Sequence, residues 1–300
     1  MKVAITGATG LVGTALTKFL ESKGDQVFPI TRSKEGMGME AILWSPQEGQ
    51  IEKEKLEGID AVVHLAGENI ASGRWNAELK RKIVESREKG TRLIAQTIAQ
   101  LENPPEVLVS SSAIGYYGDR GETQLTEDSP PGTGFLPDTC KVWEEATSPA
   151  EEAGIRVVII RTGIVLSDQG GALEKMLLPF KLGMGGKIGS GKQYMSWIAL
   201  EDLVRLIHFS ITNSDVKGPV NGTAPCPVTN REFTKTLGKV LKRPTCLPVP
   251  AVAARFALGE MADDLLLASA NVIPAKLEEH GFLFELLSLE DALQSILNRK

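Results

Sequence analysis

The sequence begins with three closely spaced glycines between an apolar run and a helical pattern. Residues 2–13 read KVAITGATGLVG, in which the apolar run ends at Thr6 and Gly7, Gly10 and Gly13 follow. The next segment, LVGTALTKFLESKG, has the spacing of an amphipathic helix. This pattern predicts a strand, a tight turn and a helix N-terminus. Backbone N–H groups there can approach a pyrophosphate because no Cβ intervenes.

Strand-like and helix-like segments alternate through the first half of the chain. After the first unit, apolar runs stand at 26–31, 41–44, 60–67, 106–113 and 155–163, and helical patterns at 75–101 and 138–153. Continuous apolar runs closed by small residues are typical of parallel strands buried on both faces. The sequence therefore predicts an α/β fold, a Rossmann-type doubly wound parallel sheet with a smaller, mostly helical C-terminal lobe.

The later pattern suggests how the chain is divided. We expect a nucleotide-binding domain over 1–166 and a smaller substrate-binding lobe over 167–300, with residues 200–223 returning to the sheet. The last 60 or so residues read as short helices punctuated by prolines. We expect this lobe to lack an independent core.

The composition of the chain limits which kinds of partner it can bind and indicates its cellular compartment. The net charge is −5, with 33 basic and 38 acidic residues, whereas proteins that neutralise many phosphates are usually basic. No apolar run of about 18 residues indicates a membrane span. Cys140, Cys226 and Cys246 fit neither a disulfide framework nor zinc-ligand spacing. We expect a cytoplasmic protein that binds a small molecule, without a metal, a nucleic acid or a membrane as partner.

The end of the second predicted strand distinguishes the two nicotinamide dinucleotides. An acidic residue there would bind the ribose 2′-OH of NAD, and an arginine would bind the 2′-phosphate of NADP. The strand ends with Thr31, Arg32, Ser33 and Lys34, and no carboxylate occurs before Glu35. The planar fork of Arg32 suits phosphate, and the Ser33 hydroxyl can add a hydrogen bond. The sequence favours NADP(H), with a solvated surface role for Arg32 as the alternative.

Motifs spread over most of the chain resemble one family. They include TGATGLVG at the start, HLAG at 64–67, VSSSAIGYYGD at 109–119, TEDSPP at 126–131 and RTGIVL at 161–166. Together they resemble the extended short-chain dehydrogenase/reductase family, which contains nucleotide-sugar epimerases and dehydratases. Later segments resemble a subgroup of small epimerase-family proteins sometimes labelled cell-division-inhibitor-like. The resemblance implies an oxidoreductase or epimerase, and dimerisation through two long helices as in relatives.

The resemblance also implies roles for matching positions. Ser112 stands where the family has its catalytic Ser or Thr, and Glu144 matches the acidic residue that closes the active-site helix motif. Arg161 follows a strand and would face the nicotinamide end. The residues predicted to contact NADP(H) are Gly7, Thr9, Gly10, Leu11, Val12, Gly13, Thr31, Arg32, Ser33, Leu65, Ala66, Gly67, Arg87, Ser110, Cys140 and Arg161.

The sequence departs from the family at its proton-transfer pair. The family uses a Tyr with a Lys four residues later, and no Tyr-x-x-x-Lys occurs in this chain. Leu136 and Cys140 stand at those two positions, and Lys141 lies one residue off, about 100° around the helix. Four side chains remain as catalytic candidates: Ser112, Tyr116, Tyr117 and Glu68. Each also has a non-catalytic interpretation: the serine could bind the backbone, the tyrosines could be packing residues, and the glutamate could be a loop carboxylate.

Arg87 replaces the asparagine that the family usually carries before a Gly-Thr pair. It either contacts a cofactor or substrate anion, in place of the missing lysine charge, or is an exposed arginine on an amphipathic helix. Two functions therefore remain open. One is an NADP-dependent oxidoreductase or epimerase acting on a small polar or nucleotide-linked substrate. The other is an NADP(H)-binding sensor or interaction protein without turnover, for example a regulator linked to cell division.

Overall fold

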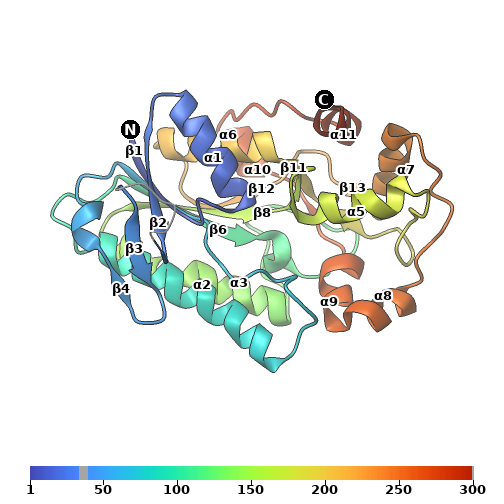
Figure 1. The fold of residues 1–300 in the computed structure, drawn as a ribbon, viewed down its shortest axis with the longest axis horizontal. Helices are drawn as coiled ribbons and strands as arrows, with labels where there is room; N and C mark the ends of the chain where they lie inside the picture. The colour runs from blue at the N-terminus through green and yellow to red at the C-terminus, as the bar shows by residue number, and fades with distance from the viewer. Residues whose placement is uncertain (34–39, 299–300) are drawn as a thin grey trace. The chain divides into compact units, whose positions relative to one another are not determined.

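Within the described residues, 1–33 and 40–298, the computed structural model contains an eight-stranded sheet (Figure 1). In spatial order its strands are β12 (Gly218–Gly222), β8 (Arg156–Thr162), β6 (Val107–Ala113), β5 (Ala61–His64), β1 (Lys2–Thr6), β2 (Gln26–Thr31), β3 (Ile42–Ser45) and β4 (Gln50–Ile51). β1 pairs in parallel with β2 and β5, β5 with β6, and β2 with β3, whereas β4 pairs antiparallel with β3. The predicted Rossmann-type sheet is confirmed.

The strand order reverses at β1, and this position determines where a ligand can bind. From β1 the chain adds β2 and β3 on one side, and β5, β6, β8 and β12 on the other. In such sheets ligands bind in the crevice beyond the carboxyl ends of the strands at the switch point. The glycine turn after β1 and the segment after β5 both lie at that edge, because the two strands are parallel neighbours.

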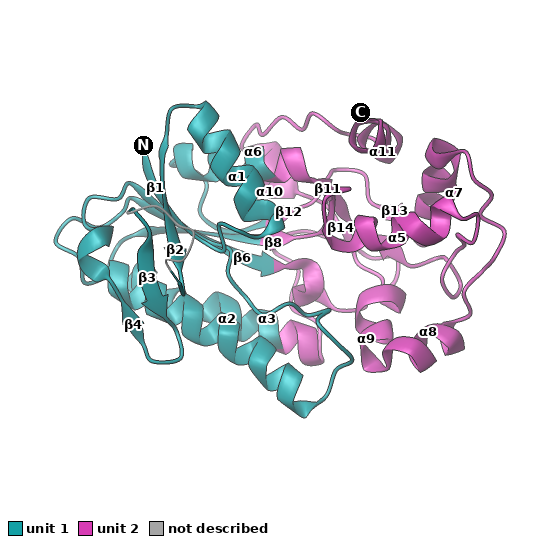
Figure 2. Cartoon of the chain, viewed as in Figure 1, with its two compact units in different colours: residues 1–112, 139–160, 204–220 teal, residues 113–138, 161–203, 221–300 magenta. Residues whose placement is uncertain are grey.

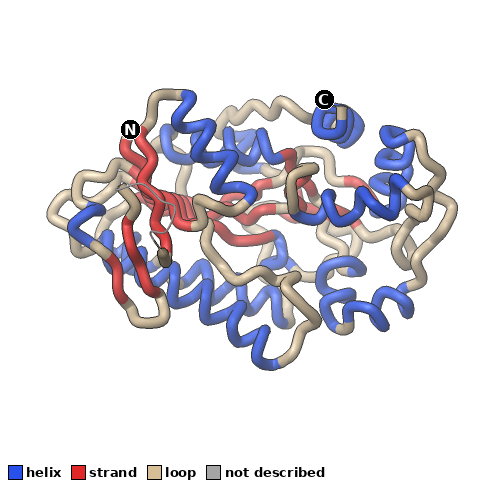
Figure 3. Tube along the Cα trace, in the orientation of Figure 1, coloured by secondary structure: helices blue, strands red, loops and turns tan. Residues whose placement is uncertain are grey.

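Helices accompany this sheet on both faces (Figures 1 and 3). They are α1 (Leu11–Ser22), α2 (Ala77–Ile98), α3 (Phe135–Glu145), α4 (Ser148–Glu152), α6 (Leu200–Thr212) and the 3₁₀ turn η1 (Lys53–Leu56). In Figure 1, α1 lies on one side of the strands and α2 on the other. Ile94 and Ile98 of α2 pack with Val62 of β5 and Leu108 of β6 in a fully buried cluster. Among the described helices, none is long and apolar enough to cross a bilayer.

The helix predicted over 138–153 is wrong in its bounds and its continuity. The structure has two helices there, and α3 begins three residues earlier at Phe135. After α3, the Thr147 hydroxyl donates to the Glu144 carbonyl at 2.7 Å. Pro149 then occupies the start of α4, where its missing N–H is tolerated, whereas inside one long helix it would have removed a hydrogen bond.

The chain divides into two compact units, each built from separate segments (Figure 2). Unit 1 comprises residues 1–112, 139–160 and 204–220, and unit 2 comprises residues 113–138, 161–203 and 221–300. This division differs from the contiguous domains 1–166 and 167–300, which stay a prediction. Residues 204–220 belong to unit 1, and the first part of β12 lies among them.

Unit 2 consists of short elements. They are η2 (Ile114–Tyr117), β7 (Gln124–Leu125), β9 (Ile164–Leu166), α5 (Gly171–Lys181), β10 (Tyr194–Met195), β11 (Trp197–Ala199), β13 (Val228–Thr229), α7 (Asn230–Leu241), α8 (Ala251–Leu258), α9 (Glu260–Ala262), the π-helical turn η3 (Asp263–Leu267), β14 (Asn271–Val272), α10 (Ala275–Glu279) and α11 (Leu289–Leu297). Helix α7 begins with a capping box, in which the Thr229 hydroxyl accepts the Glu232 N–H and the Glu232 side chain accepts the Thr229 N–H.

The expectation that the C-terminal lobe lacks a core of its own is wrong. Trp197, Phe233, Leu237 and Leu293 are completely buried in one apolar cluster within unit 2. Its members come from β9, α5, β11, α7 and α11, with Ala224 from the loop between β12 and β13. No single stretch of sequence carries enough of them to reveal a core, because they are spread over more than 100 residues.

Candidate cofactor-binding site

Two glycines of the turn in unit 1, Gly7 and Gly13, leave no room for a side chain. Gly7 has φ +69°, a conformation that favours glycine, and a Cβ there would lie 3.1 Å from the backbone nitrogen of Ala66. A Cβ on Gly13 would lie 2.1 Å from the Gly7 carbonyl oxygen. The Gly10 N–H donates to that same oxygen at 3.0 Å. The turn is therefore an exposed backbone cradle, which fits a pyrophosphate group.

Helix α1 leaves its first-turn N–H groups available to a ligand. Gly10 is its N-cap residue, no side chain caps it, and its first turn contains no acidic residue. By contrast, side chains cap α2, α7 and α11, and each of these helices has an acidic residue in its first turn. Uncapped N–H groups and the helix dipole favour an anion. Thr9, Leu11 and Val12, which the sequence predicts as contacts, form this turn and helix start.

Thr6 connects the glycine turn with the segment after β5. Its hydroxyl accepts the N–H groups of Leu65 at 3.0 Å and Ala66 at 3.1 Å, and lies 2.8 Å from His64 Nδ1. Because Oγ1 already accepts two hydrogen bonds, we assign its proton to the bond with Nδ1. Sequence analysis did not select Thr6, although a polar residue ending an apolar strand is a usable signal. The hydroxyl holds the two sides of the crevice edge together.

His64 is neutral at pH 7. It is completely buried, and burial, with a smaller contribution from the Arg87 charge, lowers its pKa to about 4. Its ring meets Trp44 edge to face, with 5.9 Å between ring centroids. Within the described part of the chain, Nε2 has no hydrogen-bond partner. His64 thus supports the crevice as an uncharged packing residue.

Arg32 stands where the sequence predicts a 2′-phosphate contact. The pairing of Thr6 with Ile30 places Arg32 on the strand next to β1, just beyond its carboxyl end. Arg32 and Ser33 are exposed, and the Thr31 hydroxyl donates to the Ser33 carbonyl at 2.9 Å. Lys34 and Glu35 lie outside the described residues. Arg32 makes no ion pair with any residue in the described ranges, so its guanidinium is available there.

Arg87 packs against Gly67 and Glu68, in the segment after β5, and is not a solvated surface arginine. It donates to the carbonyls of Glu68 at 3.0 Å and Ile83 at 3.2 Å, and its Cζ lies 4.8 Å from the Trp143 ring centroid. A Cβ on Gly67 would lie 3.5 Å from Arg87 Cζ. Burial lowers the pKa of Arg87, which remains charged at neutral pH. Among described residues it pairs with no carboxylate.

Ser112 and Glu144 form a close polar pair in unit 1. The Ser112 hydroxyl donates to Glu144 Oε1 at 2.6 Å, joining β6 to α3 across 32 positions. Sequence analysis singled out both residues but did not predict their contact. Cys140, on the same helix, is buried, whereas Lys141 is exposed. Neither supplies a lysine amine at the position that the family uses.

Burial weakens the prediction for Ser110. Its side chain is enclosed within β6, opposite His64 in the sheet register. A ligand at the edge of the sheet could meet its backbone but not its hydroxyl.

In unit 2, Tyr117 is a core residue. It is completely buried, and its hydroxyl donates to Asn221 Oδ1 at 2.7 Å. Burial raises its pKa to about 12, so it keeps its proton at neutral pH. These contacts oppose the prediction that Tyr117 is a displaced catalytic acid, because a substrate cannot reach the hydroxyl.

Arg161 forms part of the same buried arrangement. It donates to the Tyr117 hydroxyl at 3.0 Å and the Glu127 carbonyl at 3.2 Å, and its Cζ lies 3.5 Å from the Tyr116 ring centroid. Arg161 is itself buried, so these contacts give it a structural role in unit 2. Its predicted contact with the cofactor gains no support, and Tyr116, which packs against it, gains none as an acid.

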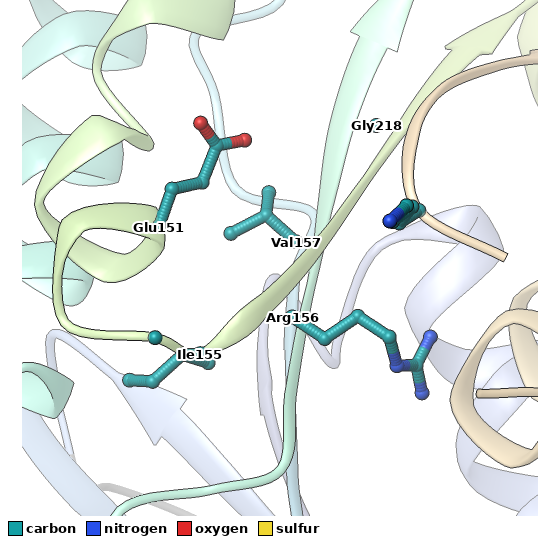
Figure 4. A pocket seen from close by; sticks show the side chains of 7 residues that line it. Glu151, Ile155, Arg156, Val157 and Gly218 are labelled. Carbon is teal, nitrogen blue, oxygen red and sulfur yellow. The ribbon is translucent and has the colours of Figure 1, made fainter. Parts of the chain in front are cut away.

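A pocket of about 480 Å³ lies elsewhere in unit 1, where β8 and β12 begin (Figure 4). Glu151, Ile155, Arg156 and Val157 help to line it, and none of the predicted site residues does. The Arg156 guanidinium donates to the carbonyls of Ser210, Ile211 and Val216. It therefore binds the end of α6 and the turn that follows it.

Comparison with known proteins agrees with this geometry. The NAD dependent epimerase/dehydratase family model matches residues 3–221, and a domain of unknown function (DUF1731) matches 249–296. An epimerase family protein of Mycobacterium bovis is 43% identical over 97% of this chain and 96% of its own. A chloroplastic SDR39U1 homolog of Arabidopsis thaliana is 39% identical over 99% of this chain and 87% of its own.

One solved structure is similar to this chain over the full length of both proteins. The crystal structure of human epimerase family protein SDR39U1 with NADPH has a TM-score of 0.93 and 34% sequence identity, and each chain is covered over 100% of its length. Sequence identity, family model and fold agree with the resemblance predicted from the motifs. This chain therefore belongs to the NAD dependent epimerase/dehydratase family.

Proposed function

We propose that this protein binds NADP(H) at the glycine turn of unit 1 and acts as an oxidoreductase or epimerase on a small polar or nucleotide-linked substrate. The observation that carries the proposal is the cradle formed by Gly7, Gly10 and Gly13 against an uncapped helix N-terminus. A pyrophosphate suits this turn because helix α1 begins there without a side-chain cap, which leaves its first-turn N–H groups to an anion. The human relative crystallised with NADPH supports the phosphorylated cofactor.

The remaining cofactor contacts follow from the edge of the sheet. Arg32 would hold the 2′-phosphate, and Leu65, Ala66 and Gly67 would pass beside the adenosine ribose. Arg87 would supply a positive charge beneath that segment, since its guanidinium is partly buried and has no carboxylate partner among the described residues. A buried unpaired charge is costly, so an anion brought near it is stabilised.

The Ser112–Glu144 pair is the proposed proton-transfer group. When bound, the nicotinamide supplies hydride transfer. Ser112 is itself buried, as Ser110 is, so this role requires a substrate that reaches the end of β6. The substrate hydroxyl would give its proton to Ser112 Oγ as the serine proton moves to Glu144 Oε1, 2.6 Å away. This role replaces the missing tyrosine and lysine without using Tyr117. We propose the cytoplasm as the compartment, although one plant relative carries a chloroplastic name.

Replacing Arg32 tests the choice of cofactor. Arg32→Asp should weaken NADPH binding by about 100-fold, because it removes charge-assisted hydrogen bonds worth about 1.5–3 kcal/mol and adds repulsion. NADH binding should change by less than about threefold. Titrations followed by cofactor fluorescence measure both. Lys18→Asp makes the same charge change on the exposed part of α1 and should preserve the NADPH preference. Equal weakening of both cofactors by Arg32→Asp would contradict the assignment.

Replacing Arg87 tests its role in a different way. Arg87→Gln should weaken NADPH and NADH to the same extent, by about tenfold, because this charge would act on the part common to both. Arg87→Lys keeps the charge and should retain more of the affinity. Unchanged binding by Arg87→Gln would assign the guanidinium to packing on Trp143 alone, without affecting the Arg32 result.

A specific observation also favours the second function, an NADP(H)-binding sensor or interaction protein. Helix α3 carries Leu136 and the buried Cys140 where the family has its Tyr and Lys. Protein loaded with NADPH should be tested on a panel of carbonyl compounds and sugar nucleotides. Hydride transfer that Ser112→Ala abolishes supports the enzyme. Tight NADPH binding without turnover of any panel member supports the sensor.

A further inference from the structure

Unit 2 exposes large apolar side chains on two short helices and the segments beside them. Phe256 and Val252 of α8 are 85% and 74% exposed and stand one helical turn apart. Leu178 and Leu182, at the end of α5, have the same spacing and are also exposed. We call the following residues the exposed apolar set: Leu178, Leu182, Met184, Leu247, Val252 and Phe256.

The backbone joins these residues into one region of unit 2. Arg243 Nε donates to the Lys181 carbonyl at 2.8 Å, so the chain after α7 lies against the end of α5. Farther along, the Val249 N–H donates to the Lys187 carbonyl at 2.9 Å, and the Gly189 N–H donates to the Val249 carbonyl at 2.8 Å. Helix α8 follows directly at Ala251. Segments 175–187 and 242–256 therefore run side by side.

This region is basic, although the protein as a whole is acidic. Segments 175–187 and 242–256 contain six basic residues and no Asp or Glu, whereas the whole chain has a net charge of −5. The basic residues are Lys175, Lys181, Lys187, Lys242, Arg243 and Arg255. Arg255 pairs with Asp263 at 2.9 Å, which marks the acidic border beyond α8. Lys181, Lys242 and Arg243 are exposed and pair with no carboxylate in the described residues.

We propose that this surface of unit 2 docks on an anionic lipid bilayer. Protruding apolar side chains surrounded by Lys and Arg are the pattern that inserts at a membrane interface. Phe256 is almost fully exposed, so a protein partner would need a preformed pocket to bury it. A fluid lipid layer needs no such pocket. A second copy of the chain would bring the same positive charge to the contact. Acidic residues flank the two segments, with Glu174 just before the first and Glu260 and Asp263 after the second, so the net charge of the chain hides the basic stretch between them.

Vesicle binding tests the proposal independently of the cofactor. The full chain should co-sediment with vesicles of equal parts phosphatidylglycerol and phosphatidylcholine, and not with pure phosphatidylcholine. Raised salt should weaken binding, because charges separated by more than about 10 Å are screened near 0.1 M ionic strength. The double variant Val252→Asp, Phe256→Asp should lose at least about tenfold in affinity. The double variant Lys181→Glu, Lys242→Glu should also lose at least about tenfold.

Matched controls separate this effect from misfolding. Leu283→Asp changes an exposed leucine outside the set and should bind vesicles like the wild type. Circular dichroism and NADPH titration should be unchanged in every variant. Failure of the wild-type chain to bind anionic vesicles would overturn the proposal, as would undiminished binding by the double aspartate variant. A loss of dimer, seen by light scattering in that variant without vesicle binding, would assign the surface to a second copy instead.

Discussion

Gly13→Ala should abolish most NADPH binding. The added Cβ would lie 2.1 Å from the Gly7 carbonyl oxygen and 2.7 Å from the Ala8 Cα, so backbone rather than a flexible side chain must move. Overpacking of this kind costs about 1–3 kcal/mol. The forced shift of the turn displaces the N–H groups that would meet the pyrophosphate, so we expect the dissociation constant to rise about 5- to 150-fold. Fluorescence titration with NADPH measures it, and thermal unfolding reports any loss of stability.

Gly10→Ala separates the approach of the ligand from the packing of the turn. A Cβ on Gly10 would lie 3.3 Å from the same carbonyl oxygen, and the Gly10 backbone, at φ −76°, accepts alanine. We expect wild-type thermal stability but weaker NADPH binding, because the added methyl group would stand where the backbone has to approach the pyrophosphate. Wild-type affinity in Gly13→Ala would mean that the cofactor does not depend on the close approach of this turn.

Acid should destabilise the protein through His64. Its pKa is 6.5 when unfolded and about 4 in the folded chain, so between these values the unfolded state binds more protons. The free energy of unfolding therefore falls as pH drops below 6.5, and the loss is complete near pH 4. One pKa unit corresponds to about 1.4 kcal/mol, which gives about 3 kcal/mol in total and about 2 kcal/mol between pH 7 and pH 5.

His64→Asn isolates this contribution from the carboxylates that titrate in the same range. The asparagine oxygen can replace Nδ1 as acceptor for the Thr6 hydroxyl, and it does not titrate. Urea unfolding at pH 7 and pH 5 should show a loss smaller by about 2 kcal/mol in the variant than in the wild type. Equal losses in both proteins would mean that His64 becomes charged without cost, against its burial beside Trp44.

Much of unit 1 could be predicted because its signals are local. The glycine spacing, the alternating apolar runs and Arg32 after the second strand each lie within a few residues, and every strand predicted from them is present. The prediction of a single helix over 138–153 is wrong, although the sequence holds a local signal for the break. Pro149 stands at the start of α4 and marks the break, and the prediction made no use of it.

The tyrosines show what local patterns cannot decide. Tyr116 and Tyr117 stand close to Ser112 in the sequence, so they were reasonable candidates for a displaced acid. Tyr117 instead donates to Asn221, more than 100 positions away, and this contact makes it a core residue. The same limit applies to Ser112 and Glu144, which were both selected but whose hydrogen bond was not foreseen.

The sequence by itself determined the glycine turn, the parallel sheet and the positive charge after the second strand, because hydrophobic period and glycine spacing act over short distances. Only the tertiary structure decided that the C-terminal half has its own core, that Tyr117 is buried, and that basic and apolar side chains gather on one part of unit 2. The physical reason is that burial and pairing depend on residues far apart in the chain. No local pattern carries that information.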